Sequence, residues 1–200
     1  MSIRIATHDD LQNIIKLDQQ LYPENNLGQY TLSHILTIGI SHVMIIDNQI
    51  VGYICVNDLL INQLSENINL ELKKIISKSE WFVNKKKLKI DGEKYFCTIS
   101  LIGVMEKYRS LLPNLLKQVI KYYAMRKCHT KFIVVFVRKN NISDISKINT
   151  TKTINMADEY KKLYQSAGFI FSDIDEPNLF GCPNDNGLMM YKKISFFDLF

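Results

Sequence analysis

Two apolar segments separated by one helical segment constrain the fold of this chain more than any other feature. The first is Tyr95-Phe-Cys-Thr-Ile-Ser-Leu-Ile-Gly-Val104, and the second is Phe132-Ile-Val-Val-Phe-Val137. Their density of β-branched and aromatic residues is typical of buried strands. Residues 111–126 lie between them and predict a helix, because Pro113 fits the first turn, where its missing N–H is not needed.

The same alternation continues to the end of the chain. Residues 156–167 predict a helix that Gly168 terminates, since glycine accepts the left-handed backbone found after many helices. Short strands are expected at residues 169–171 and 188–191, separated by a loop rich in Pro, Asn and Gly. Strands alternating with helices favour one α/β or α+β domain.

The first half of the chain supplies further elements of the same kind. A helix starting near Thr7 or Asp9 and ending near Leu21 is indicated by a polar N-cap followed by apolar residues at helical spacing. The Asp47-Asn48-Gln49 segment predicts a hairpin turn, because Asp and Asn tolerate unusual backbone angles. The other predicted elements are a strand at 3–5, a helix at 29–38, and hairpin strands at 43–46 and 50–56.

Two stretches interrupt this order. Residues 57–92 contain a predicted helix at 61–78, and the Asp91-Gly92 pair predicts a turn in a hairpin at 81–94. Residues 138–155 are rich in Asn, Ser, Thr and Lys and predict an inserted loop. With 200 residues, the chain is expected to form a single domain that carries insertions at 57–92 and 138–155.

Composition narrows the class of protein. The chain is 46% hydrophobic with a formal net charge of +5, and its N-terminus has charged residues where a signal peptide would be apolar. No segment is apolar for long enough to span a bilayer, so we expect a soluble cytoplasmic protein without membrane contact. The four cysteines are widely spaced and no histidine pattern suits a metal, so no metal site is expected. Lys85-Lys-Lys-Leu-Lys89 predicts a solvated segment more strongly than a nucleic-acid contact.

Two motifs carry the functional argument. One is Tyr164-Gln-Ser-Ala-Gly168-Phe169, and the other is Ile102-Gly-Val104-Met-Glu-Lys-Tyr108-Arg109. Together with the order of strands and helices, they resemble the GCN5-related N-acetyltransferase (GNAT) superfamily over nearly the whole chain. The resemblance implies a mixed, mostly antiparallel sheet flanked by helices, with two strands splayed around the cofactor. It also implies transfer of an acyl group, by default acetyl from acetyl-CoA, to an amine acceptor by direct attack.

The resemblance places the coenzyme A site at the end of the long strand and the start of the next helix. The family's Arg/Gln-x-x-Gly-x-Gly/Ala motif corresponds to Arg109-Ser-Leu-Leu112-Pro113-Asn114, so the glycines are missing. Leu112 puts a side chain where glycine allows close backbone approach, and Pro113 removes an amide donor. The residues expected to bind the cofactor are Ile102, Val104, Arg109, Ser110, Leu111, Leu112, Asn114, Asn141 and Tyr164.

Tyr164 matches the family's tyrosine that protonates the departing coenzyme A thiolate. A phenol with an ordinary pKa is protonated at neutral pH and can act as an acid. The alternative interpretation is a helix tyrosine that packs its ring. Ser100 is expected to position a water molecule, while Glu24, Asp58, Glu80 and Glu106 are weak candidates for a general base because surface positions suit them better.

The segment from Tyr22-Pro23 to Tyr30 resembles the substrate loop of protein N-terminal acetyltransferases. This likeness slightly favours a peptide or protein amine over a small-molecule amine and makes Tyr22, Pro23 and Tyr30 the expected substrate-binding residues. The missing glycines keep a second hypothesis open, in which a degenerate acetyltransferase fold serves as a binding or regulatory module. The sequence leaves a homodimer open and does not favour nucleic acid as a partner.

Overall fold

One sheet organises the computed structural model, which describes residues 1–23, 29–58, 66–79, 96–125, 132–138, 150–176, 187–195 and 198. Its seven strands lie in the order β1-β2-β3-β4-β5-β7-β6. They are β1 (Ser2–Ile5), β2 (Ile40–Ile46), β3 (Gln49–Asp58), β4 (Phe96–Val104), β5 (Phe132–Arg138), β6 (Ile170–Glu176) and β7 (Gly187–Lys193). Within the described sheet β4 and β5 form the one parallel pair. The sheet is therefore mixed and mostly antiparallel, as predicted.

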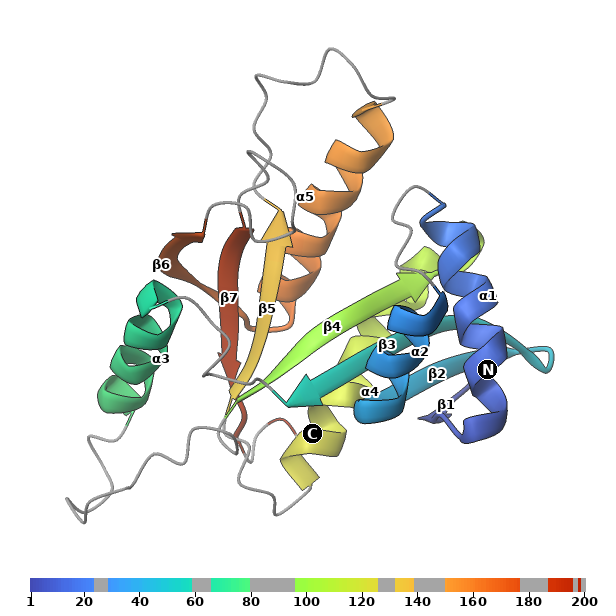
Figure 1. Ribbon diagram of the computed structural model, residues 1–200, viewed down its shortest axis with the longest axis horizontal. Coiled ribbons are helices and arrows are strands. Elements are labelled where there is room, and N and C mark those ends of the chain that lie inside the picture. Colours follow the sequence, from blue (N-terminus) through green and yellow to red (C-terminus); the bar gives the residue numbers. More distant parts are fainter. Residues whose placement is uncertain are drawn as a thin grey trace.

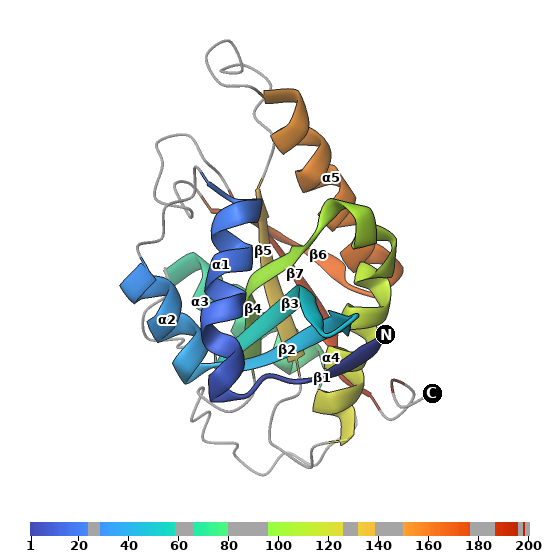
Figure 2. The same ribbon diagram turned by 90° about the vertical axis from the view of Figure 1, so that its right-hand side faces the viewer.

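Helices cover both faces of the sheet (Figures 1 and 2), with α1, α2 and α3 on one face and α4 and α5 on the other. The helical elements are η1 (His8–Asp10), α1 (Leu11–Leu21), α2 (Gln29–Ile38), α3 (Glu66–Ser79), η4 (Glu106–Leu111), α4 (Leu112–Met125) and α5 (Thr150–Ser166). None of the described helices is both long and apolar enough to cross a membrane.

Buried apolar side chains fill both layers. A cluster that includes Val104, Leu116 and Tyr164 joins the sheet to α4 and α5. A second cluster, which includes Ile14 and Leu36, joins β2 and β3 to α1 and α2. A third lies between α3 and the strands β5 and β7. The sheet is thus buried on both faces, which explains why its central strands are almost continuously apolar.

Local chemistry fixes two of the boundaries. Asp47 and Asn48 both have positive φ, at 50° and 61°, so the β2–β3 hairpin has the tight turn that the sequence predicted. Asp10 accepts hydrogen bonds from the backbone N–H of Thr7 and from both ends of the Arg4 guanidinium. This network ties the first strand to the start of the first helix, where a polar cap was expected.

The two predicted insertions contain more regular structure than their composition suggested. Strand β3 extends to Asp58, and the described part of the helix predicted at 61–78 is α3, from Glu66 to Ser79. Helix α5 begins at Thr150, inside the stretch that was expected to be a loop. The loop prediction was wrong there because Thr and Asn have only modest helix propensity, and local propensity did not decide the outcome. The hairpin predicted at 81–94 lies outside the described residues.

Candidate functional site

The sheet opens between β4 and β5, which meet at one end and diverge toward the other (Figure 1). The two strands pair over three positions, ending at Thr98 opposite Val134. Just beyond this point the register of β4 against β3 shifts, so that Ser100 is an extra, bulged residue between Ile99 and Leu101. Bulges bend a strand and increase its twist. The splay expected from the resemblance is therefore present, and it begins at Ser100.

The backbone of β4 presents two donors to this opening. Met105 donates its N–H to the carbonyl oxygen of Val51 on β3 at 2.8 Å. Because N–H groups alternate along a strand, Gly103 also faces β3, while Ile102 and Val104 turn their N–H groups to the opposite edge. Strand β5 has already diverged there. Ile102 and Val104 are thus placed as the resemblance implied for residues that hold an acyl-pantetheine arm.

Two tyrosines meet beside this edge. Tyr22, immediately after α1, donates its hydroxyl hydrogen to the carbonyl oxygen of Ile102 at 2.7 Å. Its hydroxyl oxygen lies 2.9 Å from the hydroxyl oxygen of Tyr160 on α5. A carbonyl can only accept, so the single hydroxyl hydrogen of Tyr22 is committed to Ile102, and Tyr160 is the donor in the second bond. Burial raises the pKa of both tyrosines, so both are protonated at neutral pH.

Tyr164 lies one helical turn after Tyr160 and is only 2% exposed. Its ring stacks on Tyr160 and packs against Phe169, with ring centroids 6.4 Å and 5.2 Å away. Gly168, at φ 85°, reverses the chain so that Phe169 donates its N–H back to the carbonyl oxygen of Tyr164. The Tyr164 hydroxyl makes no hydrogen bond within the described part of the chain. Burial raises its pKa, so this hydroxyl holds an uncommitted proton.

The segment expected to bind pyrophosphate has fewer backbone donors than the family's glycine-rich motif. Leu112 donates its N–H to the carbonyl oxygen of Arg109 inside the turn of η4, and Pro113 has no N–H. The Leu112 side chain is buried in the core and not turned toward the surface. It therefore does not obstruct the approach to this segment as the sequence suggested, because the first turn of α4 directs it inward.

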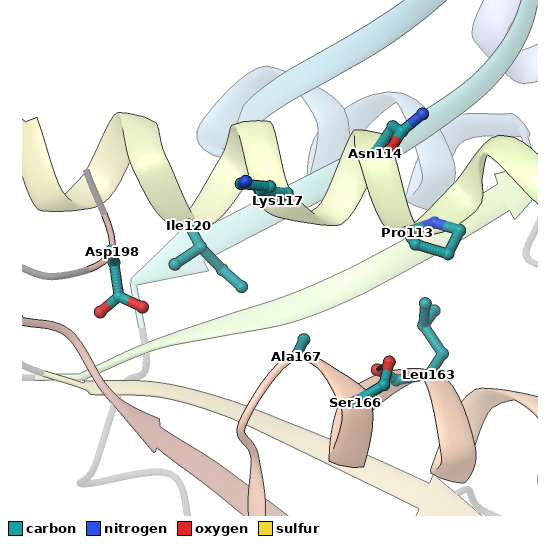
Figure 3. A pocket seen from close by; sticks show the side chains of 8 residues that line it. All are labelled: Pro113, Asn114, Lys117, Ile120, Leu163, Ser166, Ala167 and Asp198. Atoms are coloured by element: carbon teal, nitrogen blue, oxygen red, sulfur yellow. Dashed lines mark hydrogen bonds between the residues drawn. The ribbon is translucent and has the colours of Figure 1, made fainter. Parts of the chain in front are cut away.

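Charged and polar side chains lie near this segment. The Arg109 guanidinium forms an ion pair with Glu159 of α5, with Nη1 and Oε2 3.2 Å apart. A pocket of about 320 Å³ lies between α4 and α5 (Figure 3). Asn114 and Lys117 line it from α4, and Ser166 lines it from α5. Asp198 also lines the pocket, with its charge balanced by Lys192 at 2.8 Å.

The predicted site residues therefore divide into groups. Ile102, Val104, Arg109 and Tyr22 lie around the opening and its rim, and Asn114 lines the adjacent pocket. Tyr164 is buried behind them and stacks on Tyr160, the partner of Tyr22. Ser100 is exposed at the bulge, Ser110 is exposed on η4, and Leu111 packs part of its side chain on the core. Pro23 is exposed in the turn after α1. Asn141 and the side chain of Tyr30 lie outside the described residues. Asp58 and Glu106, two of the weak base candidates, are exposed.

Three residues next to the opening were not predicted from the sequence. One is Tyr160, which lies one turn before Tyr164. The others are Asp18 of α1 and Tyr53 of β3, whose hydroxyl donates to the Asp18 carboxylate. Asp18 is 5% exposed. The spacing along the helices could have indicated two of them, because Asp18 and Tyr160 each precede by one helical turn a residue already assigned to the site.

The surroundings shift both titratable groups of the Asp18–Tyr53 pair. Burial raises the pKa of Asp18, and the hydrogen bond from Tyr53 opposes this rise. Burial, reinforced by the Asp18 carboxylate, raises the pKa of Tyr53. Within the described residues, no cluster of three or more His, Cys, Asp or Glu side chains is placed to hold a metal ion.

An acyl-CoA molecule fits these residues. The open β4 edge supplies N–H donors for an amide-containing arm, and the rim supplies Arg109 and Lys117 for phosphate groups. The pocket between the two helices continues from the Pro113–Asn114 corner away from the opening. These residues therefore suit an anionic ligand that contains amide groups.

Comparison of the structure with solved structures identifies the fold. NAA60 from Arabidopsis thaliana, in complex with acetyl-CoA, superposes with a TM-score of 0.64 and 13% identity over 96% of this chain and 98% of that chain. The ribosomal-protein-alanine N-acetyltransferase from Brucella melitensis gives 0.61 and 16% over 96% and 99%. The aminoglycoside 6'-N-acetyltransferase from Enterococcus faecium gives 0.60 and 13% over 98% of both chains.

The sequence matches no protein-family model and no curated protein. The structural likeness nevertheless extends over almost the full length of each chain compared. The protein thus has a mixed α/β fold with a splayed central sheet. More particularly, it has the acetyltransferase fold of the GNAT superfamily, as the resemblance in the sequence implied.

Proposed function

We propose that this protein is an acyl-CoA-dependent N-acyltransferase that moves an acetyl group from acetyl-CoA to a primary amine. The observation that carries the proposal is the position of Tyr164. Its uncommitted hydroxyl is carried one helical turn after Tyr160, whose hydroxyl meets that of Tyr22 at the open edge of β4, the edge to which the N–H of Val104 is turned. An acid and a backbone N–H donor near one strand edge are what acyl transfer from a thioester requires.

When bound, acetyl-CoA supplies the activated acetyl group as a thioester. The N–H groups of Ile102 and Val104 orient the arm and polarise the thioester carbonyl. The amine nitrogen forms a bond to the carbonyl carbon as the carbon–sulfur bond breaks, and Tyr164 gives its proton to the departing sulfur. The phenolate regains its proton from solvent. Because burial raises the pKa of Tyr164, the hydroxyl carries its proton at neutral pH before the reaction begins.

The acceptor is proposed to be a peptide or protein amine. Tyr22 supports this, because the turn that follows α1 borders the opening on the face opposite α4 and α5. Two of the similar structures are of NAA60 and of a ribosomal-protein-alanine N-acetyltransferase. A third acetylates aminoglycosides by name, so a small-molecule amine is the alternative acceptor. Location in the cytoplasm and a homodimeric state stay predictions.

One observation favours the second candidate function, a fold that binds a partner without catalysis. The cofactor segment has lost donors at Leu112 and Pro113, and Arg109 is already paired with Glu159. Calorimetric titration with acetyl-CoA separates the two. The proposal predicts saturable binding and thiol release when an alanine-starting hexapeptide is added. Absence of binding at millimolar acetyl-CoA would contradict it and favour the binding module.

A further inference from the structure

The proposed reaction needs an acceptor for the proton that the amine loses, and the exposed carboxylates do not supply one. We infer that Asp18, acting through Tyr53, is the proton acceptor on the amine side of the opening. This inference rests on the proposed function and adds a positioning residue to it. It assigns a role to a buried carboxylate that the acetyl-transfer steps above do not use.

The geometry begins at β4. Tyr53 pairs across the β3–β4 ladder with Gly103, the residue between the two open-edge donors. Its ring lies directly over that glycine: a Cβ on Gly103 would be 2.8 Å from Cε1 and 3.1 Å from Cζ, the carbon that bears the hydroxyl. Leu21 Cδ1 is nearer still, at 2.7 Å, so the absence of a side chain at Gly103 lets the Tyr53 ring and Leu21 pack directly against β4.

The Tyr53 hydroxyl in turn donates to Oδ1 of Asp18. Oδ2 of Asp18 makes no hydrogen bond within the described part of the chain, so the carboxylate keeps an acceptor for an incoming proton. Asp18 also precedes Tyr22 by one helical turn, and both side chains therefore lie on the same side of α1. The Tyr22 hydroxyl consequently meets Ile102 and the Tyr53 ring covers Gly103, so the two tyrosines contact neighbouring residues of β4.

Asp18 and Tyr164 together account for both protons that move in the reaction. As the carbon–nitrogen bond forms, nitrogen gives one proton to the hydroxyl oxygen of Tyr53, and the hydroxyl proton of Tyr53 passes to Asp18. On the other side of the opening, Tyr164 supplies one proton to sulfur. The products leave with a neutral amide and a neutral thiol, and Asp18 and Tyr164 then exchange protons with solvent to restore the starting state.

The described titratable groups around Asp18 are tyrosines and one cysteine, so Asp18 is the carboxylate of this region. From β3 the titratable neighbours are Tyr53 and Cys55, whose thiol is directed at Ile35 and Asn57. From its own helix the neighbour is Tyr22, and through the opening it is Tyr160 of α5. The described side chains of α2 and β4 that pack against this cluster are apolar: Leu32, Ile35, Leu36 and Leu101.

The burial of Asp18 predicts how the stability of the protein depends on pH. A carboxyl whose pKa is raised on folding favours the folded state at low pH, and this contribution is lost as pH rises through the folded pKa. At pH 8 the ionised Asp18 therefore opposes folding, and Asp18→Asn should remove that cost. Asp10 is the matched control: it is also a buried aspartate, but Arg4 holds its pKa well below the usual range, so Asp10→Asn should destabilise the fold.

The experiment compares wild type, Asp18→Asn, Tyr53→Phe and Asp10→Asn, with acetyl-CoA and an alanine-starting or methionine-starting hexapeptide as probes. For Asp18→Asn we expect a urea midpoint at pH 8 equal to or above wild type and unchanged acetyl-CoA affinity. We also expect kcat to be about 10²-fold lower. The rise of kcat with pH on the acid side of the wild-type pH–rate profile (its acid limb) should be absent. Tyr53→Phe should lower kcat to a similar extent, because it removes the hydroxyl that passes the proton to Asp18. Asp10→Asn should lower the midpoint and keep kcat.

An Asp18→Asn protein with a lower urea midpoint, or with wild-type kcat and an unchanged acid limb, would overturn the inference. Failure of the proposed function has a different signature, since wild type itself would then not bind acetyl-CoA in the calorimeter. If wild type binds acetyl-CoA but acetylates neither peptide, the peptide acceptor is contradicted. The kcat of Asp18→Asn is then compared with that of wild type on an aminoglycoside, the alternative acceptor, and equal values there would overturn the inference.

Discussion

The hydroxyl oxygens of Tyr22 and Tyr160 lie 2.9 Å apart and join residues separated by 138 positions in the chain. Tyr22 follows α1 on one face of the sheet, and Tyr160 belongs to α5 on the other. Their contact therefore passes through the gap where β5 leaves β4. In this state the two tyrosines stand between the face assigned to acetyl-CoA and the face assigned to the amine.

The direction of these hydrogen bonds predicts unequal losses of stability. Tyr22→Phe removes both the bond to Ile102 and the acceptor for Tyr160, whereas Tyr160→Phe removes one bond and leaves Tyr22 on Ile102. At about 1 kcal/mol for each bond, we expect losses of about 2 and about 1 kcal/mol in the free energy of unfolding. Urea denaturation of the two variants measures this. Equal losses, or a larger loss for Tyr160→Phe, would show that the donor assignment is wrong.

The ion pair between Arg109 and Glu159 predicts competition with the cofactor. A phosphate group and the Glu159 carboxylate claim the same guanidinium, so Glu159→Gln should tighten coenzyme A binding. An exposed pair is weak, and we expect a gain of about two- to fivefold in affinity at low salt. Titration calorimetry measures it.

Asp158→Asn is the matched control for this change. Asp158 and Glu159 have the same side-chain exposure of 53%, but Asp158 pairs with Lys161 on its own helix. Both substitutions raise the net charge by the same amount. An equal gain in affinity from both variants would mean that long-range charge, and not release of Arg109, is responsible.

The burial of His42 predicts that the protein loses stability as the pH becomes acidic. It is buried on β2 against the edge of Tyr122, its Nδ1 has no hydrogen-bond partner in the described part of the chain, and burial lowers its pKa to about 4. Because the folded pKa lies below the unfolded value of about 6.5, stability is full above pH 6.5 and is lost as pH falls toward 4. We expect a loss of about 3 kcal/mol over that interval.

Replacement of His42 isolates this contribution. His42→Leu keeps the packing volume and removes the titratable ring, so most of the loss between pH 6.5 and 4 should vanish. His34→Gln, at an exposed position on α2, should leave the pH dependence as in wild type. Chemical denaturation at several pH values measures both. An unchanged acid slope in His42→Leu would show that other groups control stability there.

Much of the fold follows from local patterns. The helix predicted at 29–38 has those bounds in the structure, and the turn at Asp47–Asn48 has the predicted backbone. These elements combine strong periodicity with residues that suit the local conformation. The start of α5 was missed because residues 150–155 contain three Thr and one Asn, which have modest helix propensity, so composition indicated a loop.

The candidate site was less accessible from the sequence, because it depends on long-range contacts. Tyr164 could be proposed since Gly168 and Phe169 follow it in a recognisable spacing. Tyr160, Tyr53 and Asp18 carry no such motif, and their association appears only when α1, β3 and α5 come together. The bulge at Ser100, which begins the splay, depends on the pairing of β4 with β3 and is likewise absent from any local pattern.

The most direct test of acetyl transfer compares wild type with Tyr164→Phe in the acetylation of an alanine-starting hexapeptide by acetyl-CoA, followed by mass spectrometry. Tyr164→Phe keeps the buried ring beside Phe169 and removes only the hydroxyl. Tyr123→Phe, a buried tyrosine in the C-terminal half of α4, is the control. We predict one acetyl group per peptide in wild type, with kcat about 10²-fold lower in Tyr164→Phe, and unchanged acetyl-CoA affinity. Equal kcat in wild type and Tyr164→Phe would contradict the account.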